Sequence, residues 1–436
     1  MKVRGETLSW LIFISASPDY GVAMMSVIGS GVGVDVNRFL DTFRRFSSVG
    51  WVEGYGSTRV ALSEAHITAR RMLMDELSSL GARVYFDEAG NLFGVLGNPW
   101  GSIAIGSHTD SVPGGGRFDG IYGVIAGLEV LRIIRSSGVR LRHGVMLIDF
   151  NNEEGSRWSP PLLGSGLSAG VYSRDYVYSR LEREGKSFGD ALRDSGFMGG
   201  AENNLVRNPP RFYVELHVEQ GPELEMKGYD IGIPEGIAGI RVLELRYEGG
   251  YGHAASHTRS RRDALKAFSR LYQEVWSYFA DNVGRVRITI GSLTIEPGIY
   301  NVVPRRAIFT IDIRSYEEEM MREAESYIIR KAGIIASEEG LELKHRTLWN
   351  IDRADFDREV IGIIEDVCRE LGLKYKRMWS WAGHDAKNMA RISRTAMIFV
   401  PSVGGISHSK EEYTRDRDLV NGLLVLLKTV LRLDKI

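Results

Sequence analysis

Histidine and aspartate side chains gather in a glycine-rich stretch near residue 110. His108 and Asp110 lie in the segment Gly-Ser-His-Thr-Asp, directly after the apolar run at residues 103–105, and Asp119 follows within the glycine-rich residues 114–120. Glycine frees the backbone for a close approach to a ligand. Imidazole and carboxylate groups are ligands of divalent metal ions. The pattern therefore indicates a metal site on the loop that follows a buried strand.

Carboxylate and imidazole groups recur beside other apolar or glycine-rich segments. Glu153 and Glu154 come after the run at residues 145–150, His217 lies near the end of another run, and His408 stands in a Gly-Gly-Ile-Ser-His segment. Neighbouring side chains of an extended segment point in different directions, so one glutamate can bind a metal while the other faces a substrate as a base. Taken singly, such residues are more often structural. Together, at strand ends, they indicate a metalloenzyme.

The segments between these groups alternate between strand-like and helix-like patterns, which is typical of an α/β domain with a mostly parallel sheet. Its expected strands lie at residues 84–86, 92–96, 103–106, 144–150, 212–218 and 396–400. Its expected helices lie at residues 36–46, 63–80, 120–136, 358–371 and 420–433. Asp35 is suited to cap the first helix. This architecture places the candidate metal ligands at the carboxyl ends of strands.

The pattern changes near Gly236. Strands are expected at residues 240–247, 286–295, 307–314 and 341–347, with helices at residues 260–279 and 317–337. This β-α-β-β-α-β order predicts a ferredoxin-like α+β domain inserted into the larger one. We therefore expect a catalytic domain at residues 31–236 and 350–436, an inserted domain at residues 237–349, and an N-terminal extension at residues 1–30.

Composition limits the classes of partner. The 436 residues carry a formal net charge of -1 without a long basic run, which argues against nucleic acid and anionic membranes as partners. No stretch of the sequence is long and apolar enough to predict a membrane span. Cys368 is the sole cysteine, so any metal must be held by histidine and carboxylate side chains. A reducing cytoplasm fits this cysteine usage.

The N-terminal residues allow two interpretations. Lys2, Arg4 and the apolar residues 8–14 faintly resemble a signal peptide, although Glu6 interrupts the basic region. Alternatively, Met24 or Met25 is the true first residue of the protein.

In its ordered motifs, the chain resembles the M20 metallopeptidase superfamily, from about residue 36 onwards. The amidase branch of that superfamily comprises N-carbamoyl-L-amino-acid hydrolases, β-ureidopropionases and allantoate amidohydrolases. The matching motifs begin at Asp87, Gly106, Asn152, Glu215, Asn301, Asp312, Gly383 and Gly404. His217, in its His-Val-Glu-Gln-Gly setting, favours the amidase branch, because the peptidase branch usually has a carboxylate at that position.

The resemblance implies a centre of two divalent metal ions. The ligands would be His108, Asp119 and His217 for one ion, and Asp119, Glu154 and His408 for the other. Asp119 would bridge the ions, Glu153 would be the general base, and Asp110 would orient His108. These ligand types suit Zn, Mn, Co and Ni alike.

The resemblance also implies residues that bind the substrate. Arg314 would hold the substrate carboxylate with two parallel hydrogen bonds, assisted by Asn301 and Gln220. His253 would polarise the scissile carbonyl. His384 would contact the substrate or support the site from behind.

The resemblance also implies an oligomeric state through the inserted domain. In the family this domain is a lid that forms the dimer interface, so we expect a homodimer in which His253, Asn301 and Arg314 act across the interface. The loop after His253 is about one residue shorter than in the family and lacks its Pro and Met, which leaves His257 as an alternative to His253.

The function implied is hydrolysis of a linear C–N bond in a small ureido or amide compound that carries a carboxylate. An N-carbamoyl-L-amino acid would yield the amino acid, carbon dioxide and ammonia, and allantoate is the nearest alternative substrate. An N-acyl amino acid hydrolase or dipeptidase fits His217 less well. A non-catalytic binding protein on the same scaffold would not need to retain Glu153 beside the metal ligands.

Overall fold

The computed structural model describes residues 12–13, 25–27, 32–280 and 284–436. The chain divides into two compact units: the first comprises the residues up to Glu235 together with Asp355–Ile436, and the second is Gly236–Ala354. The boundaries expected from the sequence lie at residues 236/237 and 349/350. Most of the extension expected at residues 1–30, including most of the signal-peptide-like run and Met24, lies outside the described residues. Within the described residues, none of the helices combines the length and apolarity of a membrane span.

The first unit is built on a nine-stranded sheet whose central strands are parallel. The path through the sheet is β16-β11-β18-β10-β8-β9-β7-β6, with β17 paired to β11. The bounds are β6 Arg83–Phe86, β7 Leu92–Leu96, β8 Ile103–His108, β9 Val145–Phe150, β10 Phe212–Val218, β11 Ile231–Ile237, β16 Ala354–Asp355, β17 Tyr375–Ser380 and β18 Arg394–Val400. Strands β18, β10, β8 and β9 run parallel, whereas β7 and β11 join them antiparallel.

The four parallel strands are buried along nearly their whole length, as their continuous apolar sequences require. Every residue of β8, β9 and β10 is buried, including the polar ones. Because parallel strands end at the same edge of a sheet, the segments after them converge there.

Helices cover this sheet. Helix α3 packs against β8, β9 and β10, α12 packs against β18 and β10, and the short α11 also contacts β10 and β18. The helices of this unit are α1 Val36–Ser47, α2 Glu64–Ser79, α3 Ile121–Ser137, α4 Leu163–Ser168, α5 Arg174–Tyr178, α6 Phe188–Ser195, α7 Glu223–Lys227, α10 Arg358–Glu370, α11 Ala386–Met389 and α12 Asp416–Leu433. The expected cap of α1 is confirmed, because the Asp35 side chain accepts a hydrogen bond from the Arg38 backbone N–H.

Three small pairings complete the unit: β1 (Ile12–Phe13) with β2 (Met25–Val27), β2 with β3 (Val32–Val34), and β4 (Trp51–Val52) with β5 (Gly56–Ser57).

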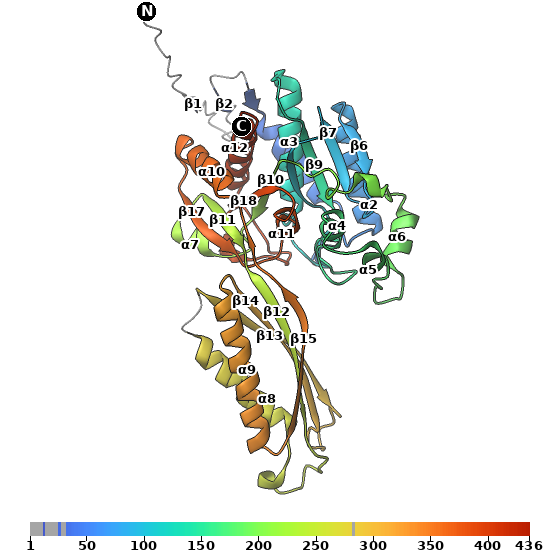
Figure 1. The fold of residues 1–436 in the computed structure, drawn as a ribbon, viewed down its shortest axis with the longest axis vertical. Coiled ribbons are helices and arrows are strands. Elements are labelled where there is room, and N and C mark those ends of the chain that lie inside the picture. Colours follow the sequence, from blue (N-terminus) through green and yellow to red (C-terminus); the bar gives the residue numbers. More distant parts are fainter. Residues whose placement is uncertain (1–11, 14–24, 28–31, 281–283) are drawn as a thin grey trace, which may run out of the picture. The chain divides into compact units, whose positions relative to one another are not determined.

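The second unit is a four-stranded antiparallel sheet with two helices on one face, as Figure 1 shows. Its elements are β12 Gly239–Glu248, α8 Ala264–Phe279, β13 Val286–Glu296, β14 Arg306–Ser315, α9 Glu318–Glu338 and β15 Glu342–Ile351. The strand order β13-β14-β12-β15 is that of a ferredoxin-like layer. Its core lies between the sheet and the apolar faces of α8 and α9.

The structure differs from the sequence expectations at a few elements. Helix α8 begins at Ala264 rather than at residue 260, because the Asp263 carboxylate caps it by accepting from the backbone N–H groups of residues 265 and 266. Helix α12 begins at Asp416, four residues earlier than expected. Strands β11 and β17 were not anticipated.

Candidate metal centre

Four adjacent parallel strands deliver the candidate ligands to one edge of the sheet. His108 is the last residue of β8, and it pairs in register with Phe150, the last residue of β9. Glu153 and Glu154 come three and four residues after Phe150, so the chain places them close to His108. His217 is the penultimate residue of β10, and His408 lies on the loop after β18. The order of the strands in the sheet thus brings together residues that are far apart in the sequence.

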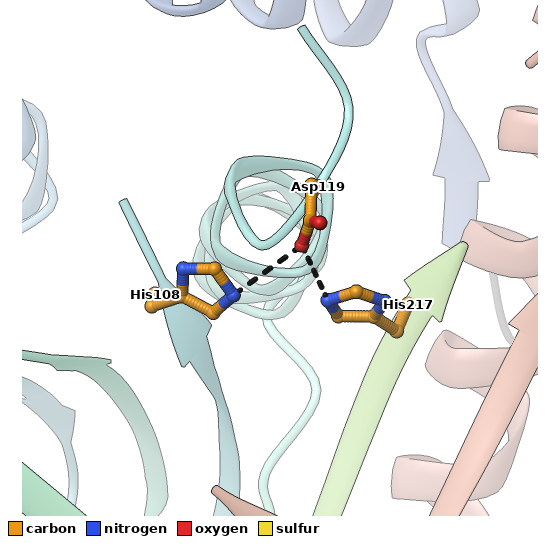
Figure 2. Close-up of side chains that lie close together, drawn as sticks. All are labelled: His108, Asp119 and His217. Atoms are coloured by element: carbon orange, nitrogen blue, oxygen red, sulfur yellow. Dashed lines mark ion pairs between the residues drawn. The ribbon is translucent and has the colours of Figure 1, made fainter. Parts of the chain in front are cut away.

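Asp119 lies at the centre of this group, two residues before α3 begins. Its Oδ1 is 3.5 Å from Nε2 of His108 and 3.1 Å from Nε2 of His217 (Figure 2). Its Oδ2 is 3.2 Å from Nε2 of His408, which in turn is 3.4 Å from Oε2 of Glu154. The two oxygens of one carboxylate therefore face two different groups of ligands.

Backbone carbonyls fix the two inner histidine rings. Nδ1 of His108 lies 3.0 Å from the carbonyl oxygen of Asp110, and Nδ1 of His217 lies 2.9 Å from that of Val218. A carbonyl only accepts, so each Nδ1 carries a proton, and Nε2 is the ring nitrogen that faces Asp119. This is the arrangement that a metal-binding imidazole requires.

Asp110 supports the site differently from the expectation. Its carboxylate is 3.7 Å from Nδ1 of His108, so the backbone carbonyl rather than the carboxylate holds the ring. The carboxylate instead accepts hydrogen bonds of 3.2 Å from the backbone N–H groups of both Glu153 and Glu154. Asp110 therefore orients the pair of glutamates.

The two glutamates point to different partners, as expected. Oε2 of Glu153 is 3.5 Å from Nε2 of His108, whereas Glu154 faces His408. The preceding Asn152 has a φ of 57°, in the left-handed region, and its side-chain amide donates to the carbonyl of Trp158 at 2.9 Å. This turn directs one carboxylate to each side of the centre.

Burial shapes the charges of these groups. Burial raises the pKa of Glu153 well above its usual range, and burial together with Asp119 raises the pKa of Glu154 to about 7. Burial alone would also raise the pKa of Asp119, but hydrogen bonds from the histidines hold it well below its ordinary value. The hydrogen bond to Asp119 raises the pKa of His408 to about 9. The site thus combines the negative charge of Asp119 with the positive charge of a neighbouring histidine.

The residues present fit a pair of divalent cations. Ligand atoms of His108, Asp119 and His217 lie within 4.8 Å of one another, as do those of Asp119, Glu154 and His408. In the described part of the chain, Oε1 of Glu154 is buried and has no hydrogen-bond partner. A buried carboxylate oxygen without a partner is costly unless a cation compensates it. The structure therefore contains candidate groups for divalent metals.

A third ligand-like group shares His217 with Glu215 and His384. Glu215 accepts hydrogen bonds from the Tyr213 hydroxyl at 3.0 Å and from the Ala386 backbone N–H at 2.8 Å. Because these bonds satisfy Glu215 and Nε2 of His217 faces Asp119, we interpret this group as support for His217.

His384 and Gln220 lie close to the centre. The His384 ring is 1% exposed and packs edge-on against the His217 ring, with 4.5 Å between ring centroids, and its Nε2 is 3.1 Å from the Ser380 hydroxyl. This position favours the supporting role over substrate contact. The Gln220 amide donates to Oδ2 of Asp119 at 2.6 Å.

His253, Asn301 and Arg314 belong to the second unit. The backbone N–H of Ala254 donates to the carbonyl of Asn301 at 2.9 Å, so the His253 loop and the Asn301 loop lie side by side. Nδ1 of His253 accepts from the Ala255 backbone N–H at 3.1 Å, which leaves the proton of a neutral ring on Nε2. The Arg314 guanidinium donates to both carboxylate oxygens of Asp312, at 2.9 and 3.1 Å.

Two residues that the sequence pattern does not single out lie against Asp119. The Ser407 hydroxyl is 3.2 Å from Oδ2 of Asp119, and the buried Glu412 accepts from the Asp119 backbone N–H. Glu412 stands four residues after His408, but nothing in the sequence distinguishes it from its neighbour Glu411.

Comparison with known proteins identifies the family. Residues 104–432 match Peptidase family M20/M25/M40. The chain belongs to this family. It is 31% identical over 413 residues to the N-carbamoyl-L-amino-acid amidohydrolase of Rhizobium meliloti, an alignment that covers 93% of this chain and 98% of the relative. It is 32% identical over 395 residues to the allantoate amidohydrolase of Bacillus subtilis (strain 168), covering 88% of this chain and 96% of the relative.

Among solved structures, the M20 chain is similar to an amidase of the hydantoinase/carbamoylase family from Burkholderia multivorans. The TM-score is 0.85 and the sequence identity 32%, with 93% of this chain and 98% of that chain covered. These likenesses confirm the fold class, the amidase branch and the enzyme class that the sequence predicts. The protein is a hydrolase of carbon–nitrogen bonds other than peptide bonds, in linear amides or amidines.

Proposed function

We propose that the protein hydrolyses an N-carbamoyl-L-amino acid to the free amino acid, carbon dioxide and ammonia, with two divalent cations at the centre around Asp119. The observation that carries this proposal is that the two oxygens of Asp119 face different ligands. Oδ1 faces His108 and His217, and Oδ2 faces His408. Such a bridging carboxylate suits two cations held close together. Zn, Mn, Co and Ni all match the ligands.

In this proposal the ligands are His108, Asp119 and His217 for one cation, and Asp119, Glu154 and His408 for the other. When bound, the cations supply Lewis-acid polarisation of the carbonyl and lower the pKa of water. Glu153 accepts a proton from the attacking water and delivers it to the leaving nitrogen. The C–O bond forms as the C–N bond breaks, and the resulting carbamate or carbamic acid releases carbon dioxide and the second amine.

The position of Glu153 supports its role as base. It is 7% exposed, its Oε2 lies 3.5 Å from Nε2 of His108, and its backbone is held by Asp110. The side chain is therefore fixed beside the ligands without being needed to complete either group of three. A positioned carboxylate that leaves the ligand sets complete is free to transfer protons.

Residues of the second unit, together with Gln220 of the first, would bind the rest of the substrate. His253 would donate from Nε2 to the carbonyl oxygen, and its Nδ1 contact with Ala255 supports that tautomer. Arg314, with Asn301 and Gln220, would hold the α-carboxylate. His257 accepts from the Arg259 backbone N–H and begins a short helical turn, which fits a structural role better than a catalytic one.

We further propose a cytoplasmic homodimer formed through the second unit, with His253, Asn301 and Arg314 completing the partner's site. Helix α8 supports this, because its Tyr272 and Trp276 are 39% and 53% exposed and lie in one aromatic row. Exposed aromatic rows of this kind are typical of interfaces. Cys368 is a buried free thiol, in keeping with a reducing compartment.

The test of the proposed reaction is ammonia release by metal-reconstituted protein from N-carbamoyl-L-amino acids and from allantoate, side by side. We expect the carbamoyl compounds to be preferred, and a chelator to remove the activity until metal is restored. Preference for allantoate would leave the proposed metal centre unchanged and would identify allantoate as the substrate. Absence of release from both, with two metals bound, would refute the proposed substrate class.

A further inference from the structure

Glu412 contacts both the chain that carries Asp119 and the loop that carries His408. Its side chain is nearly buried, and its Oε2 accepts from the backbone N–H groups of Phe118 at 2.8 Å and Asp119 at 3.2 Å. Its Oε1 accepts from the Ser407 hydroxyl at 2.9 Å. One carboxylate therefore holds both the backbone of the bridging Asp119 and the residue directly before His408.

The glycine-rich loop is shaped around this carboxylate. A Cβ atom on Gly116 would collide with the Glu412 side chain, so the loop can wrap it only with glycine at that position. Charge-assisted hydrogen bonds from backbone N–H groups are among the stronger ones in proteins. Glu412 thus sets where the chain before α3 runs, and with it where Asp119 stands.

His408 depends on such an anchor more than the other histidines do. His108 and His217 lie inside buried strands, whereas the His408 side chain is 50% exposed on a loop, at a φ of 54°. The loop is closed by backbone bonds from Val403 to Tyr413 and from Glu412 to Ser409. Since a strand does not hold His408, its position depends on side chains at the base of its loop.

Ser407 connects the two carboxylates. Its hydroxyl lies 2.9 Å from Oε1 of Glu412 and 3.2 Å from Oδ2 of Asp119. A hydroxyl has one proton, so it can donate to only one of them at a time. When Glu412 accepts that proton, the Ser407 hydroxyl does not donate to Oδ2 of Asp119, the oxygen that faces His408.

We propose that Glu412 is a positioning residue that sets the affinity of the second cation, the one assigned to Asp119, Glu154 and His408. This inference rests on the proposed two-cation centre. Glu412 fixes two of the three ligands of that cation. The first cation has two of its three ligands on β8 and β10, so its affinity depends less on Glu412.

The experiment measures Mn²⁺ binding to the metal-free full chain by equilibrium dialysis, with free Mn²⁺ quantified by its EPR signal. Glu412→Gln keeps the size of the side chain and removes its charge. We expect its second Mn²⁺ to bind about 10- to 100-fold more weakly, the usual effect of removing a group that holds a ligand, while the first remains close to wild type. The matched control is Glu411→Gln, an exposed neighbour that contacts Ser409, and it should bind both ions normally.

Ser407→Ala provides an independent variant, because it removes the hydroxyl that connects Glu412 and Asp119 to the His408 loop, and it should also weaken the second ion selectively. The melting temperature of each metal-free variant checks the fold. Wild-type affinities in both Glu412→Gln and Ser407→Ala, or an equal loss of both ions, would overturn the positioning role while leaving the two-cation centre standing. A wild-type protein that binds fewer than two Mn²⁺ would overturn the centre itself and this inference with it.

Discussion

Nε of Arg70 donates to Oδ2 of Asp149 at 2.8 Å, and neither side chain is exposed to solvent. The same carboxylate accepts from the Thr109 hydroxyl at 3.0 Å, and Thr109 lies between His108 and Asp110. His66 extends this network, since its Nε2 is 3.1 Å from the Thr109 hydroxyl. The loop that carries the metal ligands therefore rests on a buried ion pair between α2 and β9.

Breaking this pair should destabilise the protein strongly. Arg70→Leu leaves the Asp149 carboxylate buried without its cation, and removal of one partner of a buried pair typically costs about 3–5 kcal/mol. Urea unfolding, followed by circular dichroism, would measure the loss. The matched control is Arg377→Leu, which removes an exposed arginine paired with Glu365 and Glu235 and should shift the unfolding midpoint little. A small shift for Arg70→Leu as well would show that the buried pair does not hold the loop.

Glu153→Gln should abolish turnover while leaving metal binding intact. The amide cannot accept a proton from water, and general bases typically contribute about 100- to 10,000-fold to the rate. The measurement combines kcat with the metal content of the dialysed protein. Glu154→Gln is the informative partner variant, because it should lose one metal as well as activity. If Glu153→Gln retains wild-type kcat, Glu153 is not the base.

Arg314→Lys should reduce carboxylate recognition. Lysine cannot form two parallel hydrogen bonds, so kcat/KM for an N-carbamoyl amino acid should fall by about 10-fold or more. The control is the corresponding substrate with its carboxylate converted to an amide, for which wild type and variant should differ little. An equal loss on both substrates would point instead to the structural pairing of Arg314 with Asp312.

The sequence predicted the elements that carry strong periodic or apolar patterns, and it missed those that do not. Strand β10 was predicted at residues 212–218, its observed bounds, because all its residues are buried in a parallel sheet. Strand β11 contains Gly232 and Pro234, both depleted in strands, and β17 carries the charged Lys376 and Arg377 and is mostly half-exposed. Tertiary pairing stabilises these two strands, which no local pattern could indicate.

The same distinction applies to the candidate site. The histidines and acids at strand ends could be singled out because glycine and apolar runs flank them. Loop conformation determines that the Glu412 side chain is buried against the Asp119 backbone. It also determines that the carbonyl of Asp110 contacts the His108 ring, while its carboxylate binds the Glu153 backbone. Residue spacing does not determine which of two adjacent glutamates is buried, so Glu411 and Glu412 were indistinguishable before the fold was known.

Gly120→Ala should disrupt the centre through a direct collision. Gly120 has a φ of 67°, and a Cβ atom there would overlap the His108 ring. The matched control is Gly138→Ala: Gly138 follows α3 with a φ of 68° and has nothing within 4 Å of its added Cβ atom. Gly138→Ala bears the strain of a left-handed alanine, about 1–2 kcal/mol, whereas Gly120 has a ψ of -58° and lies outside that region. Gly120→Ala therefore adds the collision with His108 to a backbone strain of its own.

We expect Gly138→Ala to melt at a modestly lower temperature and to bind metal normally, whereas Gly120→Ala should lose metal affinity and activity. Calorimetric metal titration and thermal unfolding of both proteins would measure the difference. Equal metal affinities in the two variants would mean that the His108 ring can move without loss of binding. Since the ring is held between the Asp110 carbonyl and Asp119, a displacement forced by Cβ must break at least one of these contacts.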